Sequence, residues 1–196
     1  MDSRREQIVR AASAIAAEEG IGAMSVRAVA TRAGIGPSTL RHYFPSQQDL
    51  FHEVVGRSFH AQLDNLDIDD GTIPAAERLT ACMAQFLPAD DTQTRLLEGW
   101  IALYASALGP ARTEQGARLL DSLTKHARDR VNKWLEILEI DGALQPGERQ
   151  RHLTTMLAMI DGLCLDLLVP GNGTTVADAH AILTDVITHL VIASSR

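Results

Sequence analysis

Apolar residues recur along this chain at spacings of three and four, the period of one face of an α-helix, and no alternating strand pattern of useful length occurs. In the first segment such a face is lined by Ile8, Ala12, Ile15 and Ala16, and the pattern stops at the glycines near residue 20. The sequence therefore predicts an all-α protein.

Capping and breaker residues divide the next part of the chain into two short helices. Ser25 is a good N-cap for a helix through Ala33, and Gly34 supplies the left-handed residue that ends it. Pro37 suits the first turn of the second helix, and Pro45 ends that helix. The pattern predicts a helix, a tight glycine turn and another helix.

A longer amphipathic helix follows, and Ser46 with Asp49 resembles the capping box that begins such helices. Its apolar positions are Leu50, Phe51, Val54, Val55, Phe59 and Leu63. An acidic loop follows at 67–72, where the composition changes. Beyond it, prolines and glycines separate at least five helical segments, at 74–87, 91–108, 111–141, 146–169 and 174–194. About nine helices are expected in all.

Charge is distributed unevenly along the chain. The net charge of −7, from 18 basic and 25 acidic residues, excludes a chain that is basic throughout. Residues 1–60 hold seven basic and six acidic side chains, a net of +1, whereas residues 61–196 hold eleven and nineteen, a net of −8. A local basic surface near the N-terminus remains compatible with these numbers.

The same composition bears on cellular location. No apolar run approaches the roughly eighteen residues of a membrane span, and the N-terminus lacks the apolar core of a signal peptide. Cys82 and Cys164 are too few for a disulfide framework. We expect a cytoplasmic protein with reduced thiols and no membrane partner.

Residues 25–44 carry the pattern that points most directly to a function. Val26, Val29 and Ala30 can pack on Ile35 and Leu40 across the glycine turn, which leaves the outer face of the second helix exposed. That face presents Ser38, Thr39, Arg41, His42 and Tyr43. Hydroxyls, an arginine and aromatic rings on a short protruding helix suit a reader of the DNA major groove.

Neighbouring residues complete a predicted DNA surface. Arg27 and Arg32 on the preceding helix, with Arg4 and Arg5 at the chain start, are candidates for phosphate contacts. Arg4 and Arg5 can equally be solvated, and His42 can equally be a packing residue. The predicted DNA-contacting set is Arg4, Arg5, Ser25, Arg27, Pro37, Ser38, Thr39, Arg41, His42, Tyr43 and Gln47.

Residues 31–50 read TRAGIGPSTLRHYFPSQQDL. The turn, the aromatic pair and the capping motif give this stretch the spacing of TetR/AcrR-type bacterial transcriptional regulators, which the chain resembles over residues 5–55. The run at 161–163 is similar to the branch that includes choline-responsive repressors. The resemblance implies a DNA-binding domain at 1–45, and a connector helix with a ligand-binding and dimerisation domain at 46–196. It also implies a homodimeric repressor that binds a palindromic double-stranded operator and is released by an unknown small organic effector.

Four positions depart from the family pattern. Gly36 stands where Ser or Thr usually caps the recognition helix, and Ser38 stands where Gly is frequent. Arg41 replaces the usual Tyr and Gln47 replaces the usual Lys, both of which contact phosphate in the family. We expect Arg41 to take over anchoring or to read a guanine, and the contact at Gln47 to be weakened.

The effector site is predicted around two aromatic residues. Trp100 and Tyr104 lie one helical turn apart on a shared face, and their rings combine apolar area with polar groups that can orient a ligand. The other predicted pocket residues are Met83, Phe86, Met156, Met159 and Asp161. The alternative for each is ordinary core packing.

The dimer interface is predicted on the last two long helices, whose apolar sets are wider than one stripe requires. Its predicted residues are Leu153, Leu157, Ile160, Cys164, Leu183, Val186, Ile187 and Leu190. The alternative is that both helices are fully used inside a monomer.

Other chemistry finds little support in the sequence. No nucleophile elbow or zinc-protease motif occurs, and the acidic segment 65–71 lacks the spacing of a calcium loop. We expect no catalytic residue, metal or cofactor. The remaining alternatives are an activator or partner-controlled regulator of the same fold, and a cytosolic all-helical enzyme.

Overall fold

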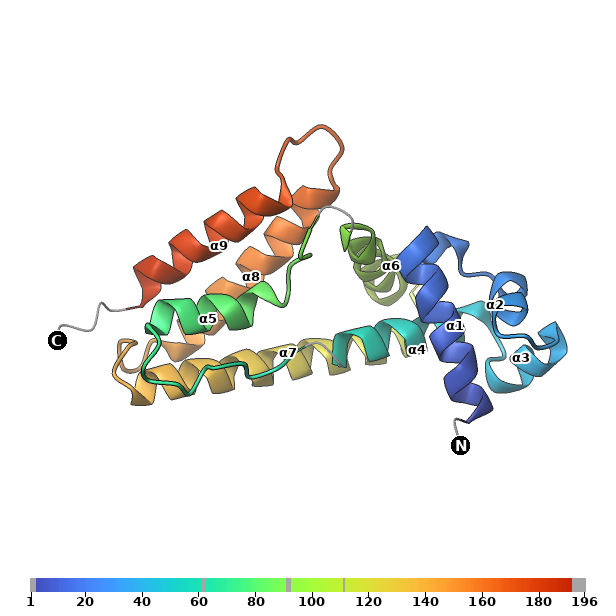
Figure 1. Cartoon of the computed structure of the whole chain (residues 1–196), viewed down its shortest axis with the longest axis horizontal. Helices are drawn as coiled ribbons and strands as arrows, with labels where there is room; N and C mark the ends of the chain where they lie inside the picture. The colour runs from blue at the N-terminus through green and yellow to red at the C-terminus, as the bar shows by residue number, and fades with distance from the viewer. Residues whose placement is uncertain (1–2, 61–62, 91–92, 111, 192–196) are drawn as a thin grey trace. The chain divides into compact units, whose positions relative to one another are not determined.

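The computed structural model describes residues 3–60, 63–90, 93–110 and 112–191. Within these residues the chain forms nine α-helices, one 3-10 turn and no strand, which confirms the all-α class (Figure 1). The first five elements are α1 (Arg4–Glu19), η1 (Ile21–Ala23), α2 (Val26–Arg32), α3 (Pro37–Tyr43) and α4 (Gln47–His60). The others are α5 (Ala75–Ala84), α6 (Arg95–Leu108), α7 (Glu114–Ile140), α8 (Arg149–Leu168) and α9 (Val176–Leu190).

The helix boundaries follow local capping chemistry. Ser25 caps α2 through a hydrogen bond that its hydroxyl accepts from the Ala28 amide, as predicted. Ser46 and Asp49 form the expected reciprocal box before α4, with Asp49 N–H to Ser46 Oγ at 3.1 Å and Ser46 N–H to Asp49 Oδ2 at 2.9 Å. The box at Thr175 and Asp178 begins α9 in the same way.

Helix α5 ends at Ala84, earlier than the predicted residue 87. The amide group of Gln85 turns back there, donating to the backbone oxygens of Asp64 at 2.9 Å and Cys82 at 3.1 Å. The next amides, of Phe86 and Leu87, make bonds to residues three positions earlier, so the last turn tightens before Pro88.

Packing divides the chain into two compact units. The first comprises residues 1–61 and 95–123, and the second comprises residues 62–94 and 124–196. Helix α7 begins in the first unit and ends in the second. The sequence-based prediction divides the chain once, at residue 45. Packing instead places α4, α6 and the first turns of α7 in the same unit as the helix-turn-helix.

We call α1 to α4 the helix-turn-helix head, because their buried side chains form one apolar cluster, and this core is built on α1. The predicted face of α1 is buried, and α1 packs on α2 and α4 (Figure 1). Gly34 adopts φ +64°, a conformation that costs glycine little, and the following Ile35 amide returns to the Ala30 oxygen at 3.0 Å. This turn sets α3 against α2 and buries Leu40.

A second cluster in the first unit joins α4, α6 and α7. Its buried members are Val55, Leu103 and Leu123, with Trp100 among the half-buried residues against them. Gly116 permits the approach of α7 to α6, because an added Cβ would lie 2.7 Å from the Ser106 carbonyl oxygen. Any side chain there would force the two helices apart.

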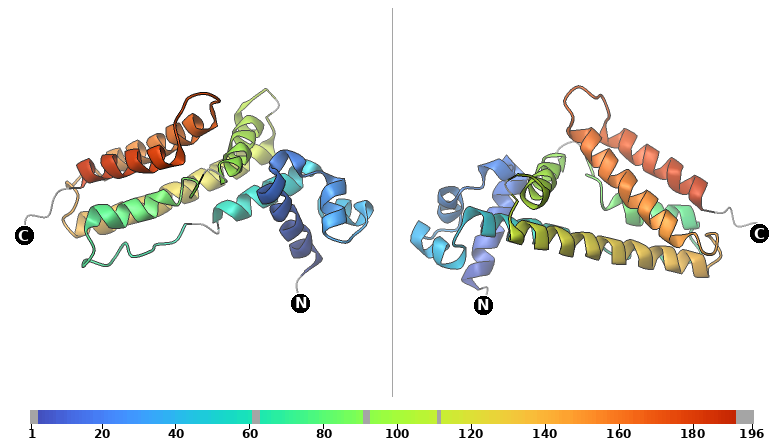
Figure 2. Two further views of the ribbon diagram at one scale, coloured as in Figure 1. Left: turned by 45° about the horizontal axis from the view of Figure 1, so that its top comes forward. Right: turned by 180° about the vertical axis from the view of Figure 1, so that it is seen from behind.

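The second unit is a helical bundle in which α5 and α8 both pack against α9 (Figure 2). Its fully buried side chains come from every helix of the unit and include Leu79, Cys82, Met83, Val131, Trp134, Leu135, Leu138, Met156, Ala179, Leu183 and Ile187. Among the described residues, no helix is long and apolar enough to cross a membrane.

Candidate nucleic-acid interface

Helix α3 is a short amphipathic helix with sharply different faces. Leu40 is fully buried and Phe44, its C-cap, is 2% exposed, so this side anchors α3 to the head. The opposite side is exposed and consists of Ser38, Thr39, Arg41, His42 and Tyr43. The rings of His42 and Tyr43 meet edge to face with centroids 5.4 Å apart. The helix thus offers two aliphatic hydroxyls, one guanidinium, an imidazole ring and a phenol to solvent.

The start of α3 differs from that of the capped helices. Gly36 is the N-cap and makes no side-chain hydrogen bond, and Pro37 occupies the first turn. The amide groups of the first turn of α3 therefore receive no hydrogen bond from an N-cap side chain. Ser25, predicted to contact DNA, uses its hydroxyl to cap α2.

Five arginines of the head fall into two groups. Arg5 pairs with Glu53, Arg32 pairs with Glu18 at 2.6 Å, and Arg4 donates to Gln7 at 2.8 Å. Arg27 and Arg41 are exposed and form no ion pair within the described residues. These two are therefore the cations most ready to meet a phosphate or a base, because no internal partner has to be given up.

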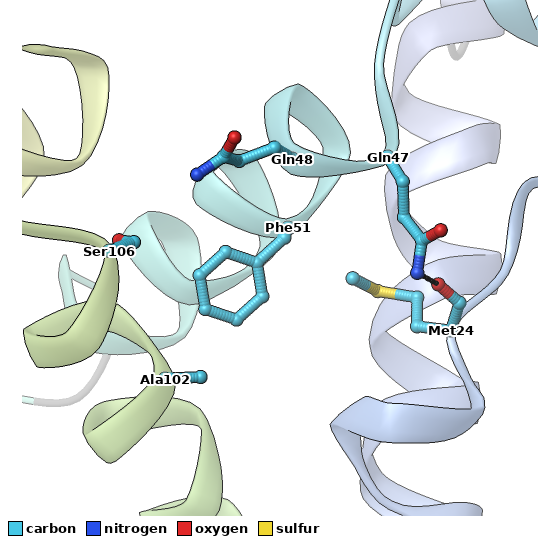
Figure 3. A pocket seen from close by; sticks show the side chains of 6 residues that line it. All are labelled: Met24, Gln47, Gln48, Phe51, Ala102 and Ser106. Carbon is cyan, nitrogen blue, oxygen red and sulfur yellow. Dashed lines mark hydrogen bonds between the residues drawn. The ribbon is translucent and has the colours of Figure 1, made fainter. Parts of the chain in front are cut away.

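Gln47 is turned toward its own chain. Its Nε2 donates to the Met24 carbonyl oxygen at 2.9 Å, which ties the start of α4 to the residue before Ser25 (Figure 3). The sequence predicted a weakened DNA contact at Gln47. In the structure its side-chain amide donates to the Met24 carbonyl oxygen. The sequence pattern does not predict this hydrogen bond, because Gln47 and Met24 are far apart along the chain.

The predicted effector residues fall in different units. Trp100 and Tyr104 lie in the first unit, where their rings meet edge to face at 5.5 Å. The other five lie in the second unit, where Met83 and Met156 are fully buried, Phe86 and Met159 are half-buried and Asp161 is on an exposed position of α8. Although the residue is exposed at the surface of α8, partial desolvation of its carboxyl raises the pKa of Asp161.

The predicted dimer residues also fall into two groups. Five are already buried within their own chain: Leu153, Ile160, Cys164, Leu183 and Ile187. Leu157, Val186 and Leu190 are half-buried and keep part of their apolar surface exposed. Between α8 and α9 lies a groove of about 460 Å³ lined by Thr155, Asp185, Val186, His189 and Leu190. Ile182, 42% exposed, adds apolar surface on α9.

Sequence reasoning missed Trp134, the largest fully buried side chain. Its Nε1 donates to Asn65 Oδ1 at 3.1 Å, and the same oxygen accepts from Arg130 at 2.9 Å. The Phe86 ring packs on it edge to face. A stripe at Leu123, Ala127, Val131, Trp134 and Leu138 carries the helical period and would have marked it as core.

The described residues form neither a metal site nor a reactive thiol. No group of three or more metal-ligating side chains comes together among them. Burial raises the pKa of each cysteine thiol, Cys82 and Cys164, to about 12, so neither is a ready nucleophile. The exposed face of α3 is therefore the candidate site, and with a helical bundle it defines a DNA-binding regulator of the helix-turn-helix class.

Comparison with known proteins agrees with this class. The family described as "Bacterial regulatory proteins, tetR family" matches residues 8–54, and "BetI-type transcriptional repressor, C-terminal" matches residues 75–191. The chain belongs to the TetR family of transcriptional regulators, with a C-terminal part of the BetI type. The resemblance inferred from residues 31–50 and 161–163 is thereby confirmed.

Individual relatives cover most of the chain. The BetI regulator of Rhizobium meliloti is 28% identical over 82% of this chain and 75% of its own. The KstR repressor of Mycolicibacterium smegmatis is 29% identical over 79% of this chain and 71% of its own. Together these relatives place the protein among transcriptional regulators.

Solved structures share the fold. A Rhodococcus transcriptional regulator superposes with a TM-score of 0.73 at 25% identity, covering 96% of both chains. A transcriptional regulator from Saccharomonospora viridis, solved in complex with choline, gives a TM-score of 0.78 at 20% identity over 96% of this chain and 97% of its own.

Proposed function

We propose that this protein is a ligand-responsive transcriptional repressor that acts in the cytoplasm. It binds a palindromic DNA operator as a homodimer and is released by a small organic effector. The observation that carries the proposal is the two-faced α3, in which Leu40 and Phe44 are buried while the polar face is exposed. A helix fixed on one side and polar on the other is suited to the major groove.

Within this proposal, Arg41 is the principal contact. It lies in the last turn of α3 and has no ion pair in the part of the chain that the structure describes. Its planar guanidinium matches the two acceptors of a guanine. Arg27 lies in the first turn of α2 and is the natural phosphate contact beside it. Arg5 and Arg32 form ion pairs with acidic residues, so their main role in this proposal is to stabilise the head.

Two heads are needed to read a palindrome, and α8 with α9 is the proposed interface. The groove lined by Val186 and Leu190 suits a helix of a second copy, which would complete a four-helix interface. A two-fold axis through it gives the DNA site its symmetry.

The effector proposal centres on Trp100 and Tyr104. Aromatic faces attract organic cations, and one structural neighbour was solved with choline, so choline is the first compound to test. Trp100→Ala should leave operator binding intact while the response to choline is lost. If Trp100 serves only the core, the variant instead loses about 3–5 kcal/mol of stability and all activities fall together.

The decisive experiment is selection of binding sites from random double-stranded DNA. We expect enrichment of a two-fold symmetric sequence with half-sites about one helical turn apart, and a footprint over both halves. An Arg41→Ala, His42→Ala double variant is the control and should enrich poorly. Selected pools indistinguishable from the starting library would overturn the proposal.

A further inference from the structure

A groove of about 370 Å³ lies within the first unit, away from the exposed face of α3. Six residues line it: Met24, Gln47, Gln48, Phe51, Ala102 and Ser106. Met24 comes from the segment between η1 and α2, the next three from the first turns of α4, and the last two from neighbouring turns of α6. The lining of the groove therefore comes from the segment before α2, from α4 and from α6.

The two sides of the groove differ in chemistry. Figure 3 shows Met24 and Gln47 on one side and Ala102 and Ser106 on the other, with the Phe51 ring between them. The thioether of Met24, the ring of Phe51 and the methyl of Ala102 make this lining largely apolar, and sulfur and aromatic faces suit a planar ring. None of the six side chains carries a charge, so a charged ligand would find no ion-pair partner among them.

The polar side chains of the groove determine which hydrogen-bonding group a ligand should carry at one end. Gln47 is already committed to the Met24 oxygen, and Ser106 donates to the Leu103 oxygen at 2.9 Å, which leaves the hydroxyl as an acceptor. The Nε2 of Gln48 reaches Thr113 Oγ1 only at 3.5 Å, a long bond that is readily exchanged. Gln48 and Ser106 together offer both a donor and acceptors, the complement of a carboxamide.

We propose that this groove, which Trp100 and Tyr104 do not line, binds a small neutral molecule with an aromatic body and a carboxamide-like end. Its volume falls in the range of small-ligand sites. Because α6 packs against η1, α1 and α4, a ring held between Met24 and Ala102 competes with the contact of α6 with the head. Occupancy therefore lowers operator affinity.

The test uses benzamide as the probe and methyl-labelled methionine as the reporter. The chain has five methionines, of which Met24 lies at the groove while Met83, Met156 and Met159 lie in the second unit. We expect a saturable shift of the Met24 methyl signal with no shift of those three. Benzamidine and benzoate keep the shape but carry opposite charges, and each should bind at least about tenfold more weakly.

Two variants locate the site. Ala102→Phe fills the groove and should abolish the Met24 shift, whereas Ala105→Phe, on the exposed side of the same helix, should retain it. Equal binding of the three probes by the unmodified protein, or equal shifts at all four methyls, would overturn the proposal without any variant. These readouts need no DNA, so they are independent of the repressor function.

The regulatory part is tested separately by operator binding. Saturating benzamide should weaken binding of the selected operator at least about threefold in the unmodified protein and in Ala105→Phe, and should have no effect in Ala102→Phe. An operator affinity that is unchanged while the Met24 site is saturated would refute the coupling.

Discussion

Arg5 on α1 and Glu53 on α4 form a two-point ion pair, in which the two terminal guanidinium nitrogens each lie 2.7 Å from a different carboxylate oxygen. The same guanidinium lies 5.0 Å from the centroid of the Phe44 ring, at the end of α3. One side chain therefore links three helices of the head. Because its guanidinium is engaged by Glu53, Arg5 is less available for a contact with a DNA phosphate.

The first prediction concerns this pair. Glu53→Ala should free Arg5 for phosphate and steepen the salt dependence of DNA binding by about one contact. The pair is partly exposed, so a double-mutant cycle with Arg5→Ala should give a coupling of only about 0.5–1 kcal/mol in stability. The measurements are binding by fluorescence anisotropy across salt concentrations, and urea unfolding. A salt slope unchanged by Glu53→Ala would show that Arg5 remains committed within the head.

The second prediction concerns Arg41, which is exposed on α3 and forms no ion pair with another residue that the structure describes. If it reads a base, Arg41→Ala should cost about 1–3 kcal/mol of operator affinity and relax sequence preference at one position. If it contacts phosphate, binding should weaken for all sequences and the salt slope should fall by about one. Arg118→Ala, which removes an exposed arginine from α7, is the control and should leave both quantities unchanged. Operator binding unaffected by Arg41→Ala would exclude both roles.

Local sequence patterns predicted the head well because its structure is decided by nearby residues. The apolar face of α1, the Ser25 cap, the Gly34 turn and the Ser46–Asp49 box are all present as expected. Each depends on residues a few positions apart, where helix period and capping chemistry leave few alternatives.

The remaining features depend on contacts that spacing does not specify. Asn65 receives bonds from Arg130 and Trp134 in a distant helix, and no local pattern pairs them. Likewise, the width of an apolar face does not say which chain covers it. Leu183 and Val186 belong to the same stripe of α9, yet the first is fully buried in its own bundle and the second lines an open groove.

This difference gives the third prediction. Val186→Asp places a charge in the proposed interface and should dissociate the dimer while the helical content is retained. Leu183→Asp places the same charge in the monomer core and should unfold the second unit. Thr184→Asp, at an exposed position of α9, is the matched control and should remain a folded dimer. Sedimentation and circular dichroism separate the three results. An unmodified protein that is monomeric at micromolar concentration would rule out the dimer.

The last prediction concerns His152 of α8, which is 3% exposed and has no hydrogen-bond partner for either ring nitrogen among the described residues. Burial lowers its pKa from 6.5, and Arg151 lowers it further against the opposing effect of Glu148 and Glu139. The unfolded chain therefore binds this proton more readily than the folded chain, so stability is lost as the pH falls through the unfolded value of 6.5 toward the lower folded pKa. His152→Leu removes both the proton and the unsatisfied nitrogens, and should stabilise the fold by about 1 kcal/mol at low pH and flatten this part of the stability profile. Urea unfolding between about pH 5 and pH 8 measures the effect, with exposed His42→Gln as the control. A pH dependence in His152→Leu as steep as that of the unmodified protein would show that another group causes the acid sensitivity.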